Sequence, residues 1–271
     1  MRHKHKSNDG HRRRSLSSAY SHFGGKAALA HLYPPPRRGL IIEPFGGGGG
    51  YALRYADHDV WLNDIDGDTF ALWTFLTGGR ASLEYLRMLP RYVIVGQPVD
   101  DLMDWSAVPP GLYQLVQSLV SCATYGTKGR RTRVSPLAAP RWPMAVRRVE
   151  RVLSRVAHWK ITNLSYDQLP NLDASWFVDA PYRCEAGERY KYPASEIDFE
   201  HLAAWCMDRF GQVTVCEQAG ANWLPFVPLT QRRRAIRSRP RRLKSNFGEV
   251  IYERPGCHTG SGRVTDLRSA A

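Results

Sequence analysis

The sequence predicts an α/β fold built on a parallel β-sheet, and the order of its apolar runs carries this prediction. An apolar run at 40–42 is followed by five glycines, by a helical pattern at 51–56 and by a second expected strand at 59–66 that ends in acids. A strand, a glycine-rich turn, a helix and a strand in this order are typical of a parallel unit. The expected elements that continue the alternation are strands at 160–169, 175–178 and 212–218 and helices at 144–159 and 199–211.

The rest of the chain is arranged around this expected sheet domain. Residues 67–142 are rich in proline, glycine and aromatics, with one helical stretch near 112–122, and we expect an insertion there that does not belong to the sheet core. A closing hairpin with a basic first arm is expected at 232–254. The sheet domain then comprises 20–66 and 143–255, flanked by a flexible basic arm at 1–19 and a flexible tail at 256–271.

Composition limits the class of protein. Hydrophobic residues make up 43% of the 271 residues, which is enough for a packed core. No run of about 18 apolar residues predicts a membrane span, and the charged N-terminus lacks the apolar segment of a secretory signal. The five cysteines are scattered, with no C-x-x-C pair. We therefore expect a cytoplasmic protein without disulfides, without a zinc site and without any other bound metal.

The net charge of +13 is concentrated in three blocks, at 1–19, 128–160 and 232–244. These blocks hold 24 of the 38 lysines and arginines but only 2 of the 25 acids, so the remainder of the chain is acidic. Clustering of this kind indicates a polyanionic partner, and nucleic acid is the partner it favours. The alternative is a set of solvated tails and helix faces.

The glycine run at 46–50 predicts a ligand that approaches the backbone closely at a helix N-terminus. An acid at the end of the second strand accepts hydrogen bonds from a ribose, and Asp64 lies 18 residues beyond Gly46. Together they predict a nucleoside-containing cofactor, and both NAD and S-adenosylmethionine are of this kind. The alternative is that the glycine run forms only a flexible turn. Asp167 follows the third strand in the same way, and its alternative role is in a turn or a helix cap.

The stretch SWFVDAPYRC, at 175–184, ends a buried strand with an acid, a stiff turn and an aromatic ring. Asp179 and the carbonyl of Ala180 can accept hydrogen bonds from an amino group, because Pro181 stiffens the turn that carries them. Tyr182, expected to be exposed, offers a face on which a base stacks. The stretch predicts a pocket for a planar ring with an exocyclic amine, and the alternative is an acidic turn with a core tyrosine. The polar residues that follow, 184–192, are expected to form a loose loop.

Four linked motifs give the chain a resemblance to a known family. They are HFGGK at 22–26, EPFGGGGG at 43–50, NDID at 63–66 and DAPY at 179–182. In this order and spacing, over about residues 20–255, the chain resembles the Dam-type (D12 class) DNA adenine N6-methyltransferases. The resemblance implies a Rossmann-like S-adenosylmethionine-dependent methyltransferase sheet with 67–142 as an inserted target-recognition region.

The resemblance also implies roles for individual residues. It assigns the S-adenosylmethionine pocket to His22, Lys26, Phe45, Gly46, Gly48, Asp64 and Asp167. It assigns the target base to Asp179, Ala180, Pro181 and Tyr182. The insertion supplies contacts to double-stranded DNA, for which we expect Lys128, Arg130, Arg131 and Arg133, mainly at phosphates. The implied enzyme is a monomer or a weak dimer that flips its target adenine out of the helix, and its small size and basic tail suit a phage or restriction–modification setting.

Two departures from the family pattern keep alternatives open. Ala180 replaces the first proline of Asp-Pro-Pro-Tyr, and His22 replaces a larger aromatic residue. The alternatives within methyl transfer are cytosine N4 and RNA as targets. Outside it they are a nicotinamide-dependent oxidoreductase that uses the glycine loop, and a catalytically inactive DNA-binding relative.

Overall fold

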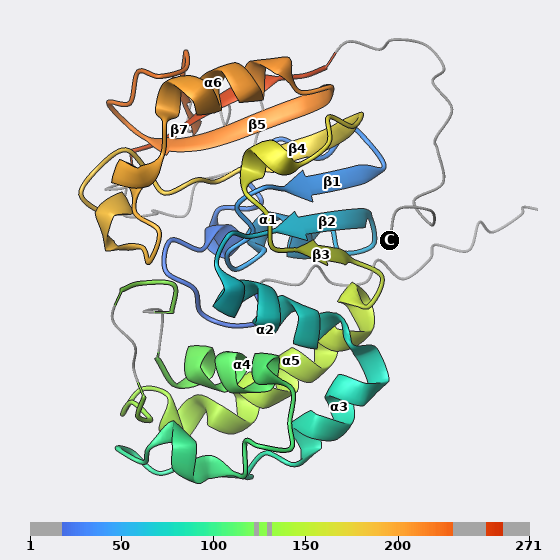
Figure 1. Ribbon diagram of the computed structural model, residues 1–271, viewed down its shortest axis with the longest axis vertical. Coiled ribbons are helices and arrows are strands. Elements are labelled where there is room, and N and C mark those ends of the chain that lie inside the picture. The colour runs from blue at the N-terminus through green and yellow to red at the C-terminus, as the bar shows by residue number, and fades with distance from the viewer. Residues whose placement is uncertain (1–17, 122–124, 129–131, 230–247, 257–271) are drawn as a thin grey trace, which may run out of the picture.

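The computed structural model describes residues 18–121, 125–128, 132–229 and 248–256, and it confirms an α/β fold (Figure 1). Seven strands form one mixed sheet in the order β3-β2-β1-β4-β5-β7-β6. The strands are β1 (Leu40–Glu43), β2 (Asp59–Asn63), β3 (Lys160–Thr162), β4 (Ala174–Val178), β5 (Gly211–Gln218), β6 (Val227–Pro228) and β7 (Glu249–Arg254). The third strand is therefore shorter than the expected 160–169.

The strand order reverses between β1 and β4. The chain proceeds from β1 to β2 and β3 on one side, then crosses to β4 and β5 on the other, and these five strands run parallel. β7 runs antiparallel to both of its neighbours, β5 and β6. A closing β-strand is thus confirmed at 249–254, while most of the first arm expected for its hairpin lies outside the described residues.

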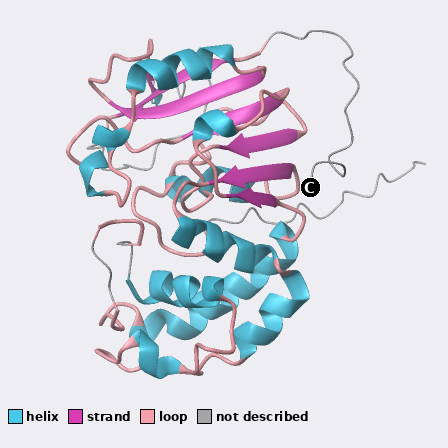
Figure 2. Cartoon of the chain, in the orientation of Figure 1, coloured by secondary structure: helices cyan, strands magenta, loops and turns pink. Residues whose placement is uncertain are grey.

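Helices cover both faces of the sheet (Figure 2). One core lies between the sheet and the N-terminal helices and includes Ile41, Leu62 and Phe177; the other, on the side of α6, includes Ile42 and Trp176. The α-helices are α1 (Gly50–Arg54), α2 (Gly67–Thr77), α3 (Gly79–Arg87), α4 (Pro110–Ser121), α5 (Trp142–Val156) and α6 (Phe199–Asp208). The 3-10 helices are η1 (Lys26–Ala28), η2 (Val99–Leu102), η3 (Ala139–Arg141), η4 (Tyr166–Gln168), η5 (Gly187–Arg189) and η6 (Ala194–Glu196).

The interpretation of 67–142 as an insertion separate from the sheet core is wrong for its first part. α2 packs against β3, and Trp73 shares one hydrophobic core with Ile41 of β1. α2 also packs against α4 and α5, so α2 joins these helices to the sheet domain (Figure 1). The predicted helix near 112–122 is confirmed as α4.

The expected amphipathic helix at 144–159 is confirmed as α5, with Val149, Val152, Leu153 and Val156 buried. Its basic face is partly used within the chain. Arg148 Nε donates to the carbonyl of Ala19 at 3.2 Å, and Arg155 forms an ion pair with Asp57 at 2.9 Å. Two of the arginines counted in the second basic block therefore have structural roles.

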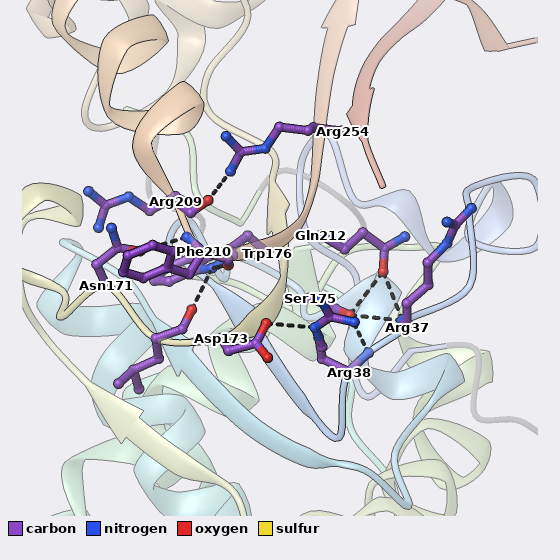
Figure 3. Close-up of polar contacts among 11 residues, drawn as sticks. Arg37, Arg38, Asn171, Asp173, Ser175, Trp176, Arg209, Phe210, Gln212 and Arg254 are labelled. Atoms are coloured by element: carbon purple, nitrogen blue, oxygen red, sulfur yellow. Dashed lines mark hydrogen bonds and ion pairs between the residues drawn. The ribbon is translucent and has the colours of Figure 1, made fainter. Parts of the chain in front are cut away.

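A polar network fixes the edge of the sheet at which β4 and β5 begin (Figure 3). The backbone N–H of Arg37 donates to Ser175 Oγ at 2.9 Å and to Gln212 Oε1 at 2.8 Å, and Ser175 Oγ donates to Gln212 Oε1 at 2.9 Å. Beside them, Arg38 Nε lies 2.6 Å from Asp173 Oδ1. Ser175 and Gln212 are buried, so their hydrogen bonds to each other and to the chain before β1 satisfy them.

Within the described ranges, no helix has the length and apolar character needed to cross a bilayer.

Candidate functional site

A cavity of about 340 Å³ lies at the carboxyl ends of β1, β2 and β4, where the strand order reverses. Open parallel sheets bind ligands at this position. The cavity is lined by nine of the residues predicted for the site: His22, Lys26, Phe45, Gly46, Gly48, Asp64, Asp167, Asp179 and Pro181. The structure therefore brings together residues that are up to 159 positions apart in the chain.

The glycine loop is a packed wall of the cavity. Gly49 has a φ of 59°, in the left-handed region that favours glycine, and it precedes α1. A Cβ on Gly50 would come within 2.6 Å of the backbone nitrogen of Ala27, so η1 and the loop touch through backbone atoms. The carbonyl of Gly47 accepts hydrogen bonds from Tyr20 Oη at 2.7 Å and from Trp73 Nε1 at 2.8 Å. The loop is held rigidly, and it is not the flexible turn of the alternative interpretation.

Asp64 connects the end of β2 to this loop. Its Oδ2 accepts the backbone N–H of Gly47 at 2.7 Å, and its Oδ1 accepts that of Asp66 at 2.9 Å. Burial raises the pKa of Asp64 to about 6, and these two N–H groups oppose the shift. Each oxygen keeps lone-pair capacity toward the cavity. Asp64 thus shapes the loop, a role that the sequence did not suggest.

Asp179, at the end of β4, is paired with a buried lysine. Lys26 Nζ lies 2.7 Å from Asp179 Oδ1 and donates to the carbonyl of Gly24 at 3.0 Å. The Lys26 side chain is 8% exposed and that of Asp179 is 19% exposed. Burial raises the pKa of Asp179 to about 6, against the lowering effect of the Lys26 ammonium. Burial alone would lower the pKa of Lys26, but the carboxylates of Asp179 and Glu249 outweigh it and raise that pKa.

The expectation of an exposed Tyr182 is wrong. The ring is half-buried beside the core, the Lys26 ammonium lies 4.6 Å from its centroid, and its hydroxyl donates to Glu249 Oε1 at 2.5 Å. Tyr182 lies next to the cavity without lining it, as does Ala180, whose side chain is buried in the second core. The sequence did not reveal Glu249 as a partner, because 67 residues separate the two side chains.

The expectation of a loose loop after DAPY is wrong, because the structure holds this loop by several contacts. Lys191 Nζ pairs with Asp66 at 2.6 Å and with Asp68 at 3.0 Å, and its backbone N–H donates to the carbonyl of Gly126 at 3.1 Å. Tyr190 forms a β-bridge with Thr127. Tyr190 and Lys191 also line the cavity. The loop therefore closes one side of the site and ties it to the segment 125–128.

The remaining residues predicted to bind the cofactor form another wall of the cavity. His22 Nδ1 lies 2.7 Å from the carbonyl of Phe23, and burial lowers the pKa of its ring. The rings of Phe45 and Tyr166 lie 5.4 Å apart, both at the cavity surface. Asp167 is exposed in η4, whose N-cap is Ser165, so the helix-capping alternative for Asp167 is wrong.

Two of the four predicted nucleic-acid contacts fall within the described residues. Lys128 and Arg133 are both exposed. The backbone N–H of Lys128 donates to the carbonyl of Arg189 at 3.2 Å, which places this lysine beside the loop that closes the cavity. The Arg133 guanidinium donates to the carbonyl of Gly96 at 2.9 Å. Arg130 and Arg131 lie outside the described residues, as do most of the first basic block and all of the third.

The cavity has an acidic lining. Its ionisable side chains are seven carboxyl groups and two lysines: Glu43, Asp64, Asp66, Asp167, Asp179, Glu196, Asp198, Lys26 and Lys191. Glu43 was not singled out as a site residue; its Oε1 accepts the backbone N–H of Ala52 at 2.6 Å, and burial raises its pKa to about 8. Both lysines already pair with acids of the same lining. The cavity thus favours a ligand with positive charge over an anion.

No protein-family model matches this chain, and no curated protein sequence matches it. Among the described residues, no three His, Cys, Asp or Glu side chains are grouped so that they could hold a metal ion.

Proposed function

We propose that this chain is an S-adenosylmethionine-dependent methyltransferase that acts on the N6 amino group of adenine in DNA. One observation carries the proposal: the glycine loop, Asp64 and Asp179 meet at a single acidic cavity where the strand order reverses. The motif resemblance also assigns these residues to one site.

The charge of the cavity supports S-adenosylmethionine over a nicotinamide dinucleotide. The bound cofactor would supply an electrophilic methyl group on a cationic sulfonium, whereas the pyrophosphate of NAD is anionic and would face mainly carboxylates. The strand order also differs from the 3-2-1-4-5-6 order of the dinucleotide-binding fold, because the antiparallel β7 lies between β5 and β6.

The residues present fit such a cofactor. The glycine loop admits close approach of its amino-acid part, and the free lone pairs of Asp64 suit ribose hydroxyls. Phe45 and Tyr166 present flat rings at the cavity surface for the adenine. The cavity volume of about 340 Å³ lies within the range of small-molecule sites.

The proposed role of Asp179 is to orient the target amine. Its carboxylate accepts a hydrogen bond from the amino group, and the carbonyl of Ala180 accepts the second, so that the nitrogen lone pair faces the methyl donor. Transfer would form a bond between the nitrogen and the methyl carbon while the carbon–sulfur bond of the sulfonium breaks and leaves a neutral thioether, and the nitrogen would lose one proton to solvent. In the structure, the Lys26 ammonium is paired with the Asp179 carboxylate that would accept the hydrogen bond of the amine. This ion pair therefore has to break when the base enters.

The acid limb of the pH profile tests this role. The ionised carboxylate of Asp179 is a stronger acceptor than the protonated acid, which also carries an O–H donor. The transfer rate is therefore expected to fall about tenfold per pH unit below its pKa of about 6. Lys26→Met removes the cation that opposes burial, so the acid limb moves to higher pH. Initial rates of methyl transfer between pH 5 and pH 9 give the acid limb of the wild type and that of the Lys26→Met variant. The control is Lys191→Met, which removes the other cavity lysine, paired with Asp66 and Asp68, and should leave the acid limb at the same pH. A Lys26→Met profile that coincides with the wild-type profile would contradict the assignment of the acid limb to Asp179.

Product analysis tests the proposed function itself. The full chain is incubated with methyl-labelled S-adenosylmethionine and unmethylated DNA, the DNA is digested, and the nucleosides are separated. Label in N6-methyladenine is expected. Label in N4-methylcytosine, or transfer only to RNA, would keep the chemistry and change the target. DNA binding without any label would favour the inactive DNA-binding relative and overturn the proposal.

A further inference from the structure

Two tyrosine hydroxyls, one of them from the DAPY motif, donate hydrogen bonds to the carboxylate of Glu249. Tyr33 Oη donates to Glu249 Oε1 at 2.6 Å, and Tyr182 Oη donates to the same oxygen at 2.5 Å. Tyr33 is buried, and its ring lies edge-on to Phe177 of β4 with centroids 5.0 Å apart. Hydrogen bonds to an ionised carboxylate are stronger than neutral ones. The Tyr182 hydroxyl is therefore held by Glu249, which does not line the cavity and which also accepts a hydrogen bond from Tyr33.

The ring of Tyr182 contacts the buried lysine of the site. The Lys26 ammonium lies 4.6 Å from the Tyr182 centroid and 2.7 Å from Asp179 Oδ1. A continuous series of contacts thus runs from Tyr33 through Glu249, Tyr182 and Lys26 to Asp179. A tyrosine ring has two side-chain torsions, and a hydrogen bond at its far end restrains both. The orientation of the Tyr182 face is consequently set at β7, outside the cavity.

We propose that Glu249 is a positioning residue, which fixes the tilt of the Tyr182 ring against which the target base stacks. This inference rests on the proposed function and deepens it, because it names a residue outside the four motifs that acts on the base rather than on the cofactor. Glu249 is the first residue of β7 and does not line the cavity. Its loss is therefore expected to affect the polymer substrate and to spare the cofactor.

Kinetics of five variants test the proposal. Glu249→Ala and Tyr182→Phe each break the hydrogen bond, and each is expected to raise the KM for DNA about tenfold or more without changing the KM for S-adenosylmethionine. The double variant should be no worse than either single one, because both remove the same interaction. Glu249→Gln keeps an acceptor oxygen for both hydroxyls and should rescue most of the effect. Tyr33→Phe leaves the Tyr182 contact in place and should have a smaller effect than Glu249→Ala.

A second measurement reads the position of the ring without activity. In the wild type, a nuclear Overhauser contact is expected between the Tyr182 ring and the Lys26 side chain. Glu249→Ala should lose it, and Glu249→Gln should keep it. A Glu249→Ala protein with both the wild-type KM for DNA and this contact would overturn the proposal, as would equal increases in both KM values. If the wild type transfers no methyl group, the proposed function fails, while loss or retention of the contact still decides whether Glu249 positions Tyr182.

Discussion

Replacement of Asp179 by asparagine is expected to reduce methyl transfer by about 10²- to 10³-fold, the range seen when one aligned polar group is removed from an active site. The amide has the size of the carboxyl group but carries no charge. Its NH2 group would point a donor at the incoming amine or at Lys26, which lies 2.7 Å from Oδ1 in the wild type. Single-turnover rates at saturating DNA and cofactor isolate the transfer step from binding.

Asp173→Asn is the matched control for this variant. Asp173 directly precedes β4, whereas Asp179 directly follows it, so both variants alter an acid at an end of the same strand. The carboxylate of Asp173 is 65% exposed and pairs with Arg38 at the edge opposite the cavity (Figure 3). Ion pairs in which the carboxylate is open to solvent contribute little to stability, so this variant should fold and turn over as the wild type does. A wild-type rate in Asp179→Asn would remove Asp179 from the proposed mechanism.

Truncation of Trp73 to alanine is expected to lower the free energy of unfolding by about 3–5 kcal/mol. The indole is fully buried, lies against Trp159 with ring centroids 5.4 Å apart, and its Nε1 donates to the carbonyl of Gly47 at 2.8 Å. The variant therefore opens a cavity under α2 and releases one of the two donors that hold the glycine loop. Urea unfolding followed by tryptophan fluorescence and by far-UV circular dichroism measures the loss.

Trp73→Phe separates the packing contribution from the hydrogen bond. The phenyl ring refills most of the space but leaves the Gly47 carbonyl with Tyr20 as its remaining donor. Its stability loss should be clearly smaller than that of Trp73→Ala, while S-adenosylmethionine affinity, measured by calorimetry, should fall in both variants. A loss below about 1 kcal/mol for Trp73→Ala would contradict the packing described for α2.

The central strands could be predicted because they are buried on both faces. Every residue of β4 is buried, as are Ile41 and Ile42 of β1, so each appears in the sequence as a short, continuous apolar run. α2 was missed for a related reason. It packs between the sheet and other helices, and its buried positions, which include Thr69, Leu72 and Phe75, do not form one apolar stripe with the usual helical spacing.

The site could be predicted only as far as its motifs extend. The cavity lining near Gly46, Asp64 and Asp179 follows from strand ends that meet at one edge of the sheet. The pairing of Lys26 with Asp179, and of Tyr182 with Glu249, joins residues far apart in sequence. No local spacing encodes such contacts, because they depend on the packing of η1 and β7 against the site.

The segment 125–128 connects the cavity with the protein surface, because Gly126 lines the cavity and Lys128 is exposed. Gly126 lines the cavity and accepts the backbone N–H of Lys191, while two residues later the exposed side chain of Lys128 faces solvent. A polymer held by Lys128 and a small molecule in the cavity would each restrict the same four residues. The ligand that binds first would lose the free energy needed to order residues 125–128. The ligand that binds second would then not incur this loss and would bind more tightly by the same free energy. If the chain binds DNA and S-adenosylmethionine as proposed, this coupling would be reciprocal, and DNA would raise the affinity for the cofactor by the same factor as the cofactor raises the affinity for DNA.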